Sequence, residues 1–521
     1  MESGRSNSRK RKLAAFEAPA AAEAPNRGAG MEHQEPPLPG EDGEHGGTGD
    51  NISQTPDAVG CPVPPLPGAD GGGSDHISHL PDDVLRVIIS LLYTREGART
   101  QILASRWRNL WRSAPLNLDH HWLCKDGEDL DAVLSRVLSD HPGPGRRFCA
   151  PVYHLHGDRA ATADAWLRSP ALDNLQELEL CCFSDRLPYP PQVPLPPPAA
   201  AFRFSETLCV AIIGDCHLPD STVQTLHFPK LKQLGLKRVS ISECSMHSMI
   251  AGCPALECLL IEQSFGFHRL RINSVTLKGI GLCASLERKG IHFGELIIEN
   301  APCLERLLQL GTTMGQRISV ISAPKLETIG CLCGINFLPT RLVFGSTVIE
   351  GLRVDTLTTS VHTVKILALD IHTLSLNVVI ILMRCFPCLE KLYIESRGPG
   401  ETNLWRRKHL DVIRSLDIRL KTICWRYYRG IKSHVDFATF FVLNAKGLKL
   451  MTLEVHEDDY NEEFIAQQRN KLQLDSKASG SARFCFTPDW SHSCARYFRV
   501  HDLALADPFE RNKPYQFSAL A

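Results

Sequence analysis

The sequence predicts an α/β protein in two parts: a small all-α unit of three short helices, followed by an irregular solenoid of short strands. Two observations predict this fold class. Between residues 75 and 119, apolar side chains recur at helical spacing, whereas from about residue 170 onwards a short apolar motif with strand-like alternation returns repeatedly. Residues 1–74 differ from both, because they are rich in Gly, Pro, Ala, Glu and Asp. We therefore expect a disordered segment ahead of the folded regions.

Length, charge and cysteine content narrow the class of protein. A chain of 521 residues exceeds one ordinary domain. Its 57 Lys and Arg residues nearly balance its 58 Asp and Glu residues, so no overall field favours nucleic acid or an anionic membrane. The 19 cysteines follow no paired framework, which is typical of reduced thiols in a cytosolic or nuclear protein. Cys331 and Cys333 lack partners at zinc-ligand spacing. The longest apolar stretch, within 374–383, is too short to span a membrane. We expect no metal, cofactor, nucleic-acid or membrane partner.

One basic cluster lies in the segment that we expect to be disordered. It consists of Arg9, Lys10, Arg11 and Lys12 and is typical of a nuclear-import signal. A solvated run of charge is an equally good interpretation. We expect the protein in the nucleus, the cytoplasm or both.

Helices are predicted between residues 80 and 116, LPDDVLRVIISLLYTREGARTQILASRWRNLWRSAPL. Pro81 and the two aspartates after it suit a first helical turn, where a missing N–H costs nothing and the helix dipole favours negative charge. The apolar residues that share a face of the first helix are Val84, Leu85, Ile88, Leu91 and Leu92. After a polar break, a second apolar set follows: Ala98, Ile102, Leu103, Trp107, Leu110 and Trp111. Such a small unit forms only a marginal core, so part of this surface should contact a partner or a neighbouring domain.

The end of this region, RWRNLWR (106–112), combines arginines with aromatic rings, as surfaces that stack single-stranded nucleic acid do. Helical spacing, however, places Trp107 and Trp111 on the same face as Leu103 and Leu110. This arrangement favours core or interface anchors over a nucleic-acid site.

The repeated motif consists of an apolar residue followed by others three and five positions later. These two positions alternate as in a strand, but on a helix they would lie about 200° apart. Nine stretches carry the motif, starting at residues 175, 231, 256, 277, 304, 326, 349, 364 and 389; the one at 304 matches more weakly, since its last position is Gln309. Most steps between 231 and 389 fall within or close to the ~20 to 29 residues of a leucine-rich repeat. A short step from 349 and a long step from 175 make the predicted solenoid irregular.

The region after residue 396 reads as strand, helix and strand over 416–430 and 437–455. No motif of a known catalytic centre is present, such as His-Glu-x-x-His, Gly-x-Ser-x-Gly or a phosphate loop. The pair His120–His121 has no third ligand nearby in the sequence, and we interpret it as part of an exposed linker. We expect no enzyme activity, with an unrecognised hydrolase or transferase site as the alternative.

The stretch ISHLPDDVLRVIISLL, followed by RTQILASRWRNLWRSAPLNLD, resembles the F-box of the large plant family of F-box proteins. Repeats with APxLExL prefixes resemble the leucine-rich arrays that follow such F-boxes, and LQLDSKASGSARFCF with HDLALADPF (501–509) resembles their FBD-type region. The resemblance divides the chain into a disordered tail (1–74), an F-box (75–119), leucine-rich repeats (120–395) and an FBD-type region (396–521).

The resemblance implies a substrate-recognition subunit of a Skp–cullin–F-box ubiquitin ligase. The F-box would dock on a Skp-type adaptor, and through it on cullin and RING subunits, while the repeats bind the protein to be ubiquitinated. Ubiquitin transfer would then occur elsewhere, so the chain would carry no catalytic residues. The alternative is a leucine-rich-repeat scaffold that binds partners without ligase assembly.

The resemblance also assigns residues. Those expected to contact the adaptor are Leu80, Pro81, Val84, Leu85, Ile88, Leu91, Leu103, Trp107 and Leu110. Some of them must instead fill the core of the F-box, and the sequence does not separate the two sets. Tyr93 departs from the family, which usually has Pro there. In the repeats, the outward strand positions should line the substrate-binding face: Gln233, Arg306, Thr328, Lys391 and Tyr393.

Overall fold

The computed structural model describes residues 77, 79–123, 129–141, 143–151, 157–181, 194–283, 291–310, 315–334, 339–396, 398, 403, 417–489 and 499–510. All of them belong to one compact unit that starts at Asp75. The predicted disorder of residues 1–74 and the basic cluster from Arg9 to Lys12 lie outside the described residues.

Three short helices form between residues 82 and 113, as the apolar spacing predicts. They are α1 (Asp82–Leu91), α2 (Thr94–Arg99, continued by a 3₁₀ turn, Thr100–Ile102) and α3 (Ser105–Ser113). Asp82 and Asp83 lie in the first turn of α1, and Arg106 of α3 donates to Asp82 at 2.7 Å. The small core of this helical unit (residues 79–114) contains Leu85, Ile89, Trp107, Leu110 and Ala114.

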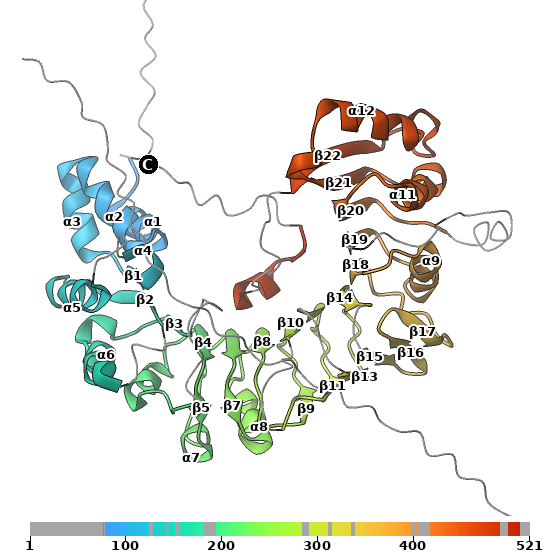
Figure 1. Cartoon of the computed structure of the whole chain (residues 1–521). Coiled ribbons are helices and arrows are strands. Elements are labelled where there is room, and N and C mark those ends of the chain that lie inside the picture. Colours follow the sequence, from blue (N-terminus) through green and yellow to red (C-terminus); the bar gives the residue numbers. More distant parts are fainter. Residues whose placement is uncertain are drawn as a thin grey trace, which may run out of the picture. The chain divides into compact units, whose positions relative to one another are not determined.

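A curved parallel sheet of fourteen strands forms the rest of the framework among the described residues (Figure 1). Its strands in spatial order are β1 (Leu116–Asp119), β2 (Gly145–Ala150), β3 (Glu177–Leu180), β4 (Val210–Gly214), β6 (Gln233–Lys237), β8 (Cys258–Glu262), β10 (Gly279–Cys283), β12 (Arg306–Gln309), β14 (Thr328–Cys333), β18 (Ile366–Asp370), β19 (Lys391–Glu395), β20 (Thr422–Tyr428), β21 (Leu450–His456) and β22 (Arg483–Asp489). Each strand pairs with the next in parallel, which is the arrangement of a repeat solenoid.

The segments between these strands cover one side of the sheet, and the described ones differ along the chain. Helices serve towards both ends: α4 (His120–Leu123), α5 (Leu130–Asp140), α6 (Ala160–Arg168), α7 (Asp220–Val223), α8 (Glu243–Ala251), α9 (Leu376–Cys385), α11 (Lys432–Asn444) and α12 (Glu462–Lys471). In the middle, a six-stranded sheet takes their place: β9 (Arg269–Asn273), β11 (Glu295–Asn300), β13 (Arg317–Val320), β15 (Arg341–Phe344), β16 (Thr347–Glu350) and β17 (Arg353–Thr356). A two-stranded pair, β5 (His217–Leu218) with β7 (Ser240–Ile241), joins the two kinds of cover.

The repeat motif locates eight of its nine predicted strands in the large sheet. The stretch at 349–354 is wrong, because it contains a turn between the antiparallel strands β16 and β17 of the six-stranded sheet. Gly351 makes this turn at a φ of 61°, a conformation that glycine adopts without strain. Leu352 lies in the turn and packs against the main core. Its position therefore reproduces the apolar spacing of a strand by coincidence.

The large sheet crosses two of the three expected domain boundaries, those after residues 119 and 395. It begins at Leu116, inside the stretch that resembles an F-box, and continues through β20, β21 and β22 of the FBD-type region without interruption. The predicted strand, helix and strand of that region are β20, α11 and β21. Among the described residues, no helix is long and apolar enough to cross a membrane; the apolar α9 has 10 residues.

Asn117 joins the helical unit to the sheet. It lies in β1, and its buried side-chain Nδ2 donates to the carbonyl oxygens of Ser90 at 2.7 Å and Leu92 at 2.9 Å. In return, the Thr94 hydroxyl donates to the Asn117 carbonyl oxygen at 2.5 Å. These bonds satisfy the carboxyl end of α1, where carbonyl groups lack partners within the helix.

We expect Asn117→Ala to lower the free energy of unfolding by about 2 kcal/mol, because it removes both amide hydrogen bonds to the carboxyl end of α1. The Ser90 carbonyl oxygen keeps one donor, the Arg146 Nη1 at 3.1 Å. Urea denaturation followed by tryptophan fluorescence measures this change. Asn109→Ala on the exposed side of α3 is the matched control and should change the value by less than about 0.5 kcal/mol. Equal effects of the two variants would show that Asn117 does not hold the junction.

Candidate partner-binding surfaces

The nine residues predicted to contact an adaptor differ in burial within the helical unit. Leu85, Trp107 and Leu110 are buried in its core, and Leu80 packs against that core from the side. The other five are exposed: Pro81, Val84, Ile88, Leu91 and Leu103. The sequence alone could not make this division, and the structure makes it directly.

The exposed residues belong to a larger set of exposed apolar side chains on the helical unit. Val87 and Ile102, which the sequence did not assign to it, are also exposed, and Ile102 reaches 85% exposure. We call Val84, Val87, Ile88, Leu91, Ile102 and Leu103 the helical apolar surface. Large apolar side chains gathered on so small a unit are typical of a protein–protein contact.

A second candidate surface is the side of the large sheet that faces away from the helices and the six-stranded sheet. We call this side the inner face. Parallel pairing places Gln233, Arg306, Thr328 and Lys391 in one row across it, through Cys258, Gly279 and Ile366. Tyr393 lies two positions further along β19 on the same face. The structure therefore brings together the five residues predicted to bind substrate.

These five residues are not open to solvent. Arg306, Thr328 and Tyr393 are buried, and Gln233 and Lys391 are half-buried. Three of the five contact residues 499–510, which we call the docked segment (Figure 1). The Arg306 Nε donates to the carbonyl oxygen of Leu503 at 2.7 Å.

The docked segment begins with one 3₁₀ turn, Val500–Ala504, and continues to Glu510. Val500, Leu503 and Phe509 are buried in an apolar cluster that includes Leu260 and Leu308 of the inner face. Two glycines of β10 leave room for Leu503: a Cβ on Gly279 would lie 2.9 Å from its carbonyl oxygen, and a Cβ on Gly281 would lie 3.1 Å from its Cδ2. A Cβ at Gly279 would force the Leu503 backbone to move, and a Cβ at Gly281 would crowd the Leu503 side chain.

The other end of the segment is held by charge. The Asp507 carboxylate accepts from the Lys391 Nζ at 2.8 Å and the Tyr393 hydroxyl at 2.9 Å, and Glu510 accepts from Lys391 at 2.7 Å. The ring of Phe509 lies 5.5 Å from that of Tyr393. Burial, with the nearby Asp507 carboxylate, raises the pKa of Tyr393, so its hydroxyl stays protonated and donates.

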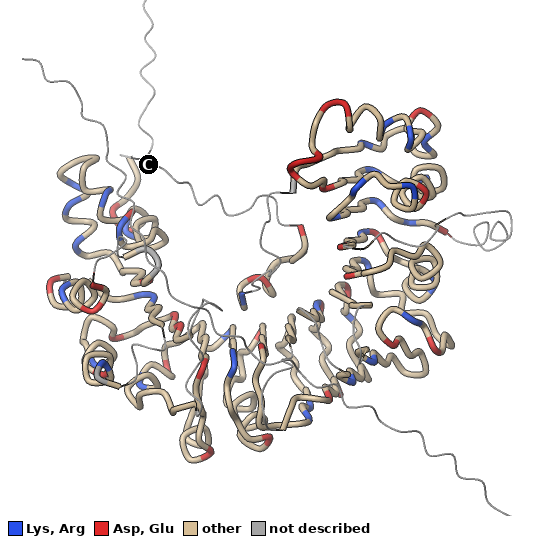
Figure 2. The backbone as a smooth tube through the Cα atoms, viewed as in Figure 1, with Lys and Arg blue, Asp and Glu red and all other residues tan. Residues whose placement is uncertain are grey.

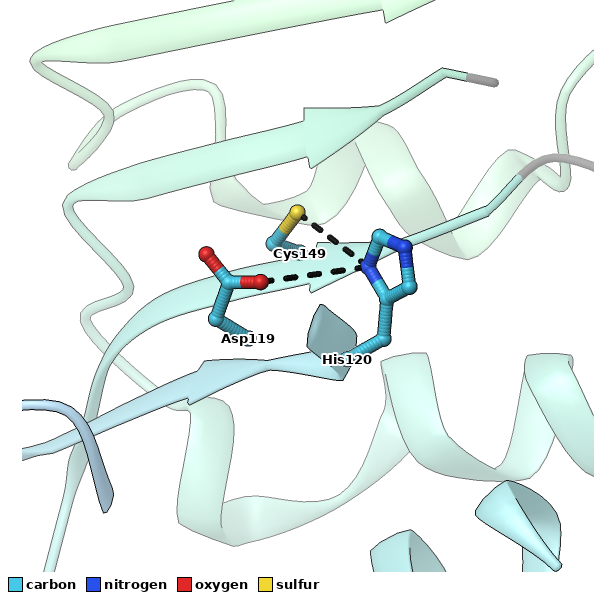
Figure 3. Close-up of side chains that lie close together, drawn as sticks. All are labelled: Asp119, His120 and Cys149. Atoms are coloured by element: carbon cyan, nitrogen blue, oxygen red, sulfur yellow. Dashed lines mark hydrogen bonds and ion pairs between the residues drawn. The ribbon is translucent and has the colours of Figure 1, made fainter. Parts of the chain in front are cut away.

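Near the start of the sheet, Asp119, His120 and Cys149 lie within 4.8 Å of one another (Figure 3). The His120 Nδ1 is 3.9 Å from Asp119 Oδ1 and 3.6 Å from the Cys149 Sγ. The prediction that His120 lies in an exposed linker is wrong. It opens α4 beside β2, where pairing of β1 with β2 supplies a neighbour that is distant in sequence; the His121 side chain lies outside the described residues.

Carboxylate, imidazole and thiol are all zinc ligands, but the electrostatics favour an ion-pair network. Arg147 already pairs with Asp119 at 3.2 Å and Glu179 at 2.5 Å. Burial, reinforced by the Glu179 and Asp119 carboxylates, raises the pKa of Cys149, so its thiol stays protonated within this network. Elsewhere Lys and Arg are interspersed with Asp and Glu over the sheet and its helices (Figure 2), so no single sign of charge dominates.

Two family models match the chain. One, described as "FBD-associated F-box protein At5g56370, LRR repeats", matches residues 163–394, from within α6 to β19. The other, described as FBD, matches residues 408–453, which include β20 and α11. The chain therefore contains one region that matches a leucine-rich-repeat family model and one that matches the FBD model. The presence of leucine-rich repeats and of an FBD-type region is thereby confirmed, although the FBD match lies ahead of the stretches at 472–486 and 501–509 that suggested it. The bounds of both regions stay predictions.

The proteins to which the chain is similar are plant proteins. The chain is 24% identical to the putative FBD-associated F-box protein At3g50710 of Arabidopsis thaliana, over 77% of the chain and 97% of the relative. It is 24% identical to the FBD-associated F-box protein At3g52670 of the same plant, over 78% and 95%. The putative F-box/FBD/LRR-repeat protein At4g00315 is 28% identical over 35% of the chain, and the match spans only 41% of that relative.

The division between core and exposed residues predicts unequal effects of substitution on the free energy of unfolding. Leu85→Ala should lower the free energy of unfolding by about 3 kcal/mol, because it opens a cavity in a small core. Leu103→Ala, at a side chain with 63% exposure, should change it by less than about 0.5 kcal/mol. Urea denaturation of both variants provides the test, and a large loss of stability in Leu103→Ala would contradict the division.

Proposed function

We propose that this chain is the substrate-recognition subunit of a Skp–cullin–F-box ubiquitin ligase. In this proposal the helical unit is the F-box and docks on a Skp-type adaptor, which links it to cullin and RING subunits. The inner face of the repeats then binds the protein to be ubiquitinated. The chain itself carries no catalytic step, since ubiquitin transfer takes place on other subunits.

The helical apolar surface is the observation that carries the proposal. A unit of three short helices would gain stability by burying Leu91, Ile102 and Leu103 in its own core, yet it leaves them at 63%, 85% and 63% exposure. Burying such side chains against a partner contributes roughly 25 cal/mol per Å² of apolar area. The relatives named as F-box proteins support the same assignment for this unit.

Tyr93 is compatible with the proposal, although the family usually has Pro at this position. Its backbone φ is −63°, which is the value that a proline ring imposes. Its carbonyl oxygen accepts from the Gly97 N–H at 2.8 Å and so starts α2. Tyr93 thus has a backbone conformation that Pro could also adopt at this position.

The double variant Leu91→Asp/Leu103→Asp should bind a purified Skp-type adaptor at least about 100-fold more weakly than the unchanged chain, since it places two charges in an apolar contact. Isothermal titration calorimetry measures the affinity. Ile321→Asp, on a repeat residue with 70% exposure, is the matched control and should bind normally. If the unchanged chain does not bind the adaptor, or if the double variant binds equally well, the scaffold alternative replaces the ligase.

We also propose that the basic cluster Arg9, Lys10, Arg11 and Lys12 directs the chain to the nucleus. Replacing all four with alanine should move a fluorescently tagged chain from nucleus to cytoplasm, because import receptors read clustered positive charge. Microscopy of plant cells measures the ratio between the two compartments. Replacement of four basic residues on the exposed side of the repeats serves as control, and an unchanged ratio in the first variant would overturn the proposal.

A further inference from the structure

We infer that the inner face between β6 and β19 is a peptide-binding site, and that the docked segment occupies it as an internal ligand. A substrate segment with the same pattern of side chains would displace residues 499–510. This inference deepens the proposed function, on which its biological meaning rests, by naming the class of substrate. The binding site itself is argued from contacts within this chain.

The docked segment contacts the sheet as a bound peptide would, rather than as a strand. Its described backbone-to-backbone hydrogen bonds are local, such as Asp502 N–H to Arg499 oxygen at 2.9 Å and Leu505 N–H to Asp502 oxygen at 3.2 Å. The contacts with the inner face come instead from side chains, including Arg306 and Lys391. Recognition through side chains can be reproduced by another chain with a similar sequence.

Three anchor points define what the site accepts. The first is the glycine-lined space on β10, which takes a leucine side chain and backbone and would exclude them if a Cβ were present. The second is Arg306, which donates a hydrogen bond to the carbonyl oxygen of that leucine. The third is the pair Lys391 and Tyr393, which takes an acidic side chain four residues later.

A peptide that fits these anchors has an apolar residue, then a leucine three positions later. An acidic residue follows four positions after the leucine, and an aromatic residue two positions after the acidic one. In the docked segment this pattern is met by Val500, Leu503, Asp507 and Phe509, of which the apolar three are buried. The inferred substrate class is thus a short acidic and apolar peptide. A basic peptide would face Lys391 and Arg306 and be repelled.

The arrangement favours exchange. Burial of three apolar side chains is offset by the ordering of a whole segment, so the docked state gains only a modest net stability. Attachment to the same chain nevertheless gives the segment an effective concentration on the order of mM. A free peptide must therefore compete with a tethered one, and releasing the tethered one should reveal the site.

The test uses the full chain and a fluorescent peptide with the sequence of residues 499–510. The double variant Leu503→Asp/Asp507→Lys removes the leucine and reverses the charge that faces Lys391, so its docked segment should leave the site. Fluorescence anisotropy should show that it binds the peptide at least ten-fold more tightly than the unchanged chain. Adding Arg306→Ala to the released chain should then weaken peptide binding at least ten-fold.

The matched control is Leu505→Asp/Ala506→Lys, since both residues belong to the same segment and are exposed, Leu505 at 46%. It should bind the peptide as weakly as the unchanged chain. Circular dichroism checks folding, and Phe509→Ala provides a milder release if the double variant does not fold; it should show a smaller gain.

No gain in a folded release variant, an equal gain in the control, or a gain that Arg306→Ala does not reverse would each overturn the inference. The measurement contains no adaptor. Failure here therefore leaves the proposed docking of the helical unit untouched, and failure of adaptor binding leaves this result untouched.

Discussion

Hydrogen bonding between successive parallel strands is the constraint on which the rest of this structure depends. From β1 to β22, each strand must arrive beside the previous one in register, because only then are the backbone groups of both satisfied. This requirement does not prescribe the structure of the segment that connects one strand to the next. The described connecting segments are therefore helices towards both ends of the sheet and strands of a second sheet in the middle. The hydrogen bonds between the strands of the large sheet follow the same parallel pattern throughout.

This constraint explains what the sequence could predict. Inward leucines recur wherever a strand must bury one side against the returning segments, so eight of nine motifs located strands correctly. The ninth failed because the apolar residues around Gly351 satisfy the same spacing from a turn. Motifs of the amino-terminal strands β1, β2 and β4 were not recognised, since the repeat there is broken by long intervals.

The candidate surfaces were less predictable, for two physical reasons. In α1, apolar residues surround more than one side of a short helix, so periodicity could not distinguish buried Leu85 and Ile89 from exposed Val84 and Ile88. On the inner face, register could place Arg306 and Lys391 in one row, but it could not show that a segment distant in sequence lies on them. The neighbours of His120 were missed for the second reason, because Cys149 approaches it only through strand pairing.

The junction at Asn117 has a mechanical consequence. Its two hydrogen bonds attach the helices directly to the first strand, with no pliable linker between them. The helical unit and the large sheet should therefore move as one rigid body. A molecule bound on the inner face would then keep a fixed distance and orientation relative to a molecule bound to the helices. A small change in the twist between strands would add up along the sheet and displace the first molecule relative to the second.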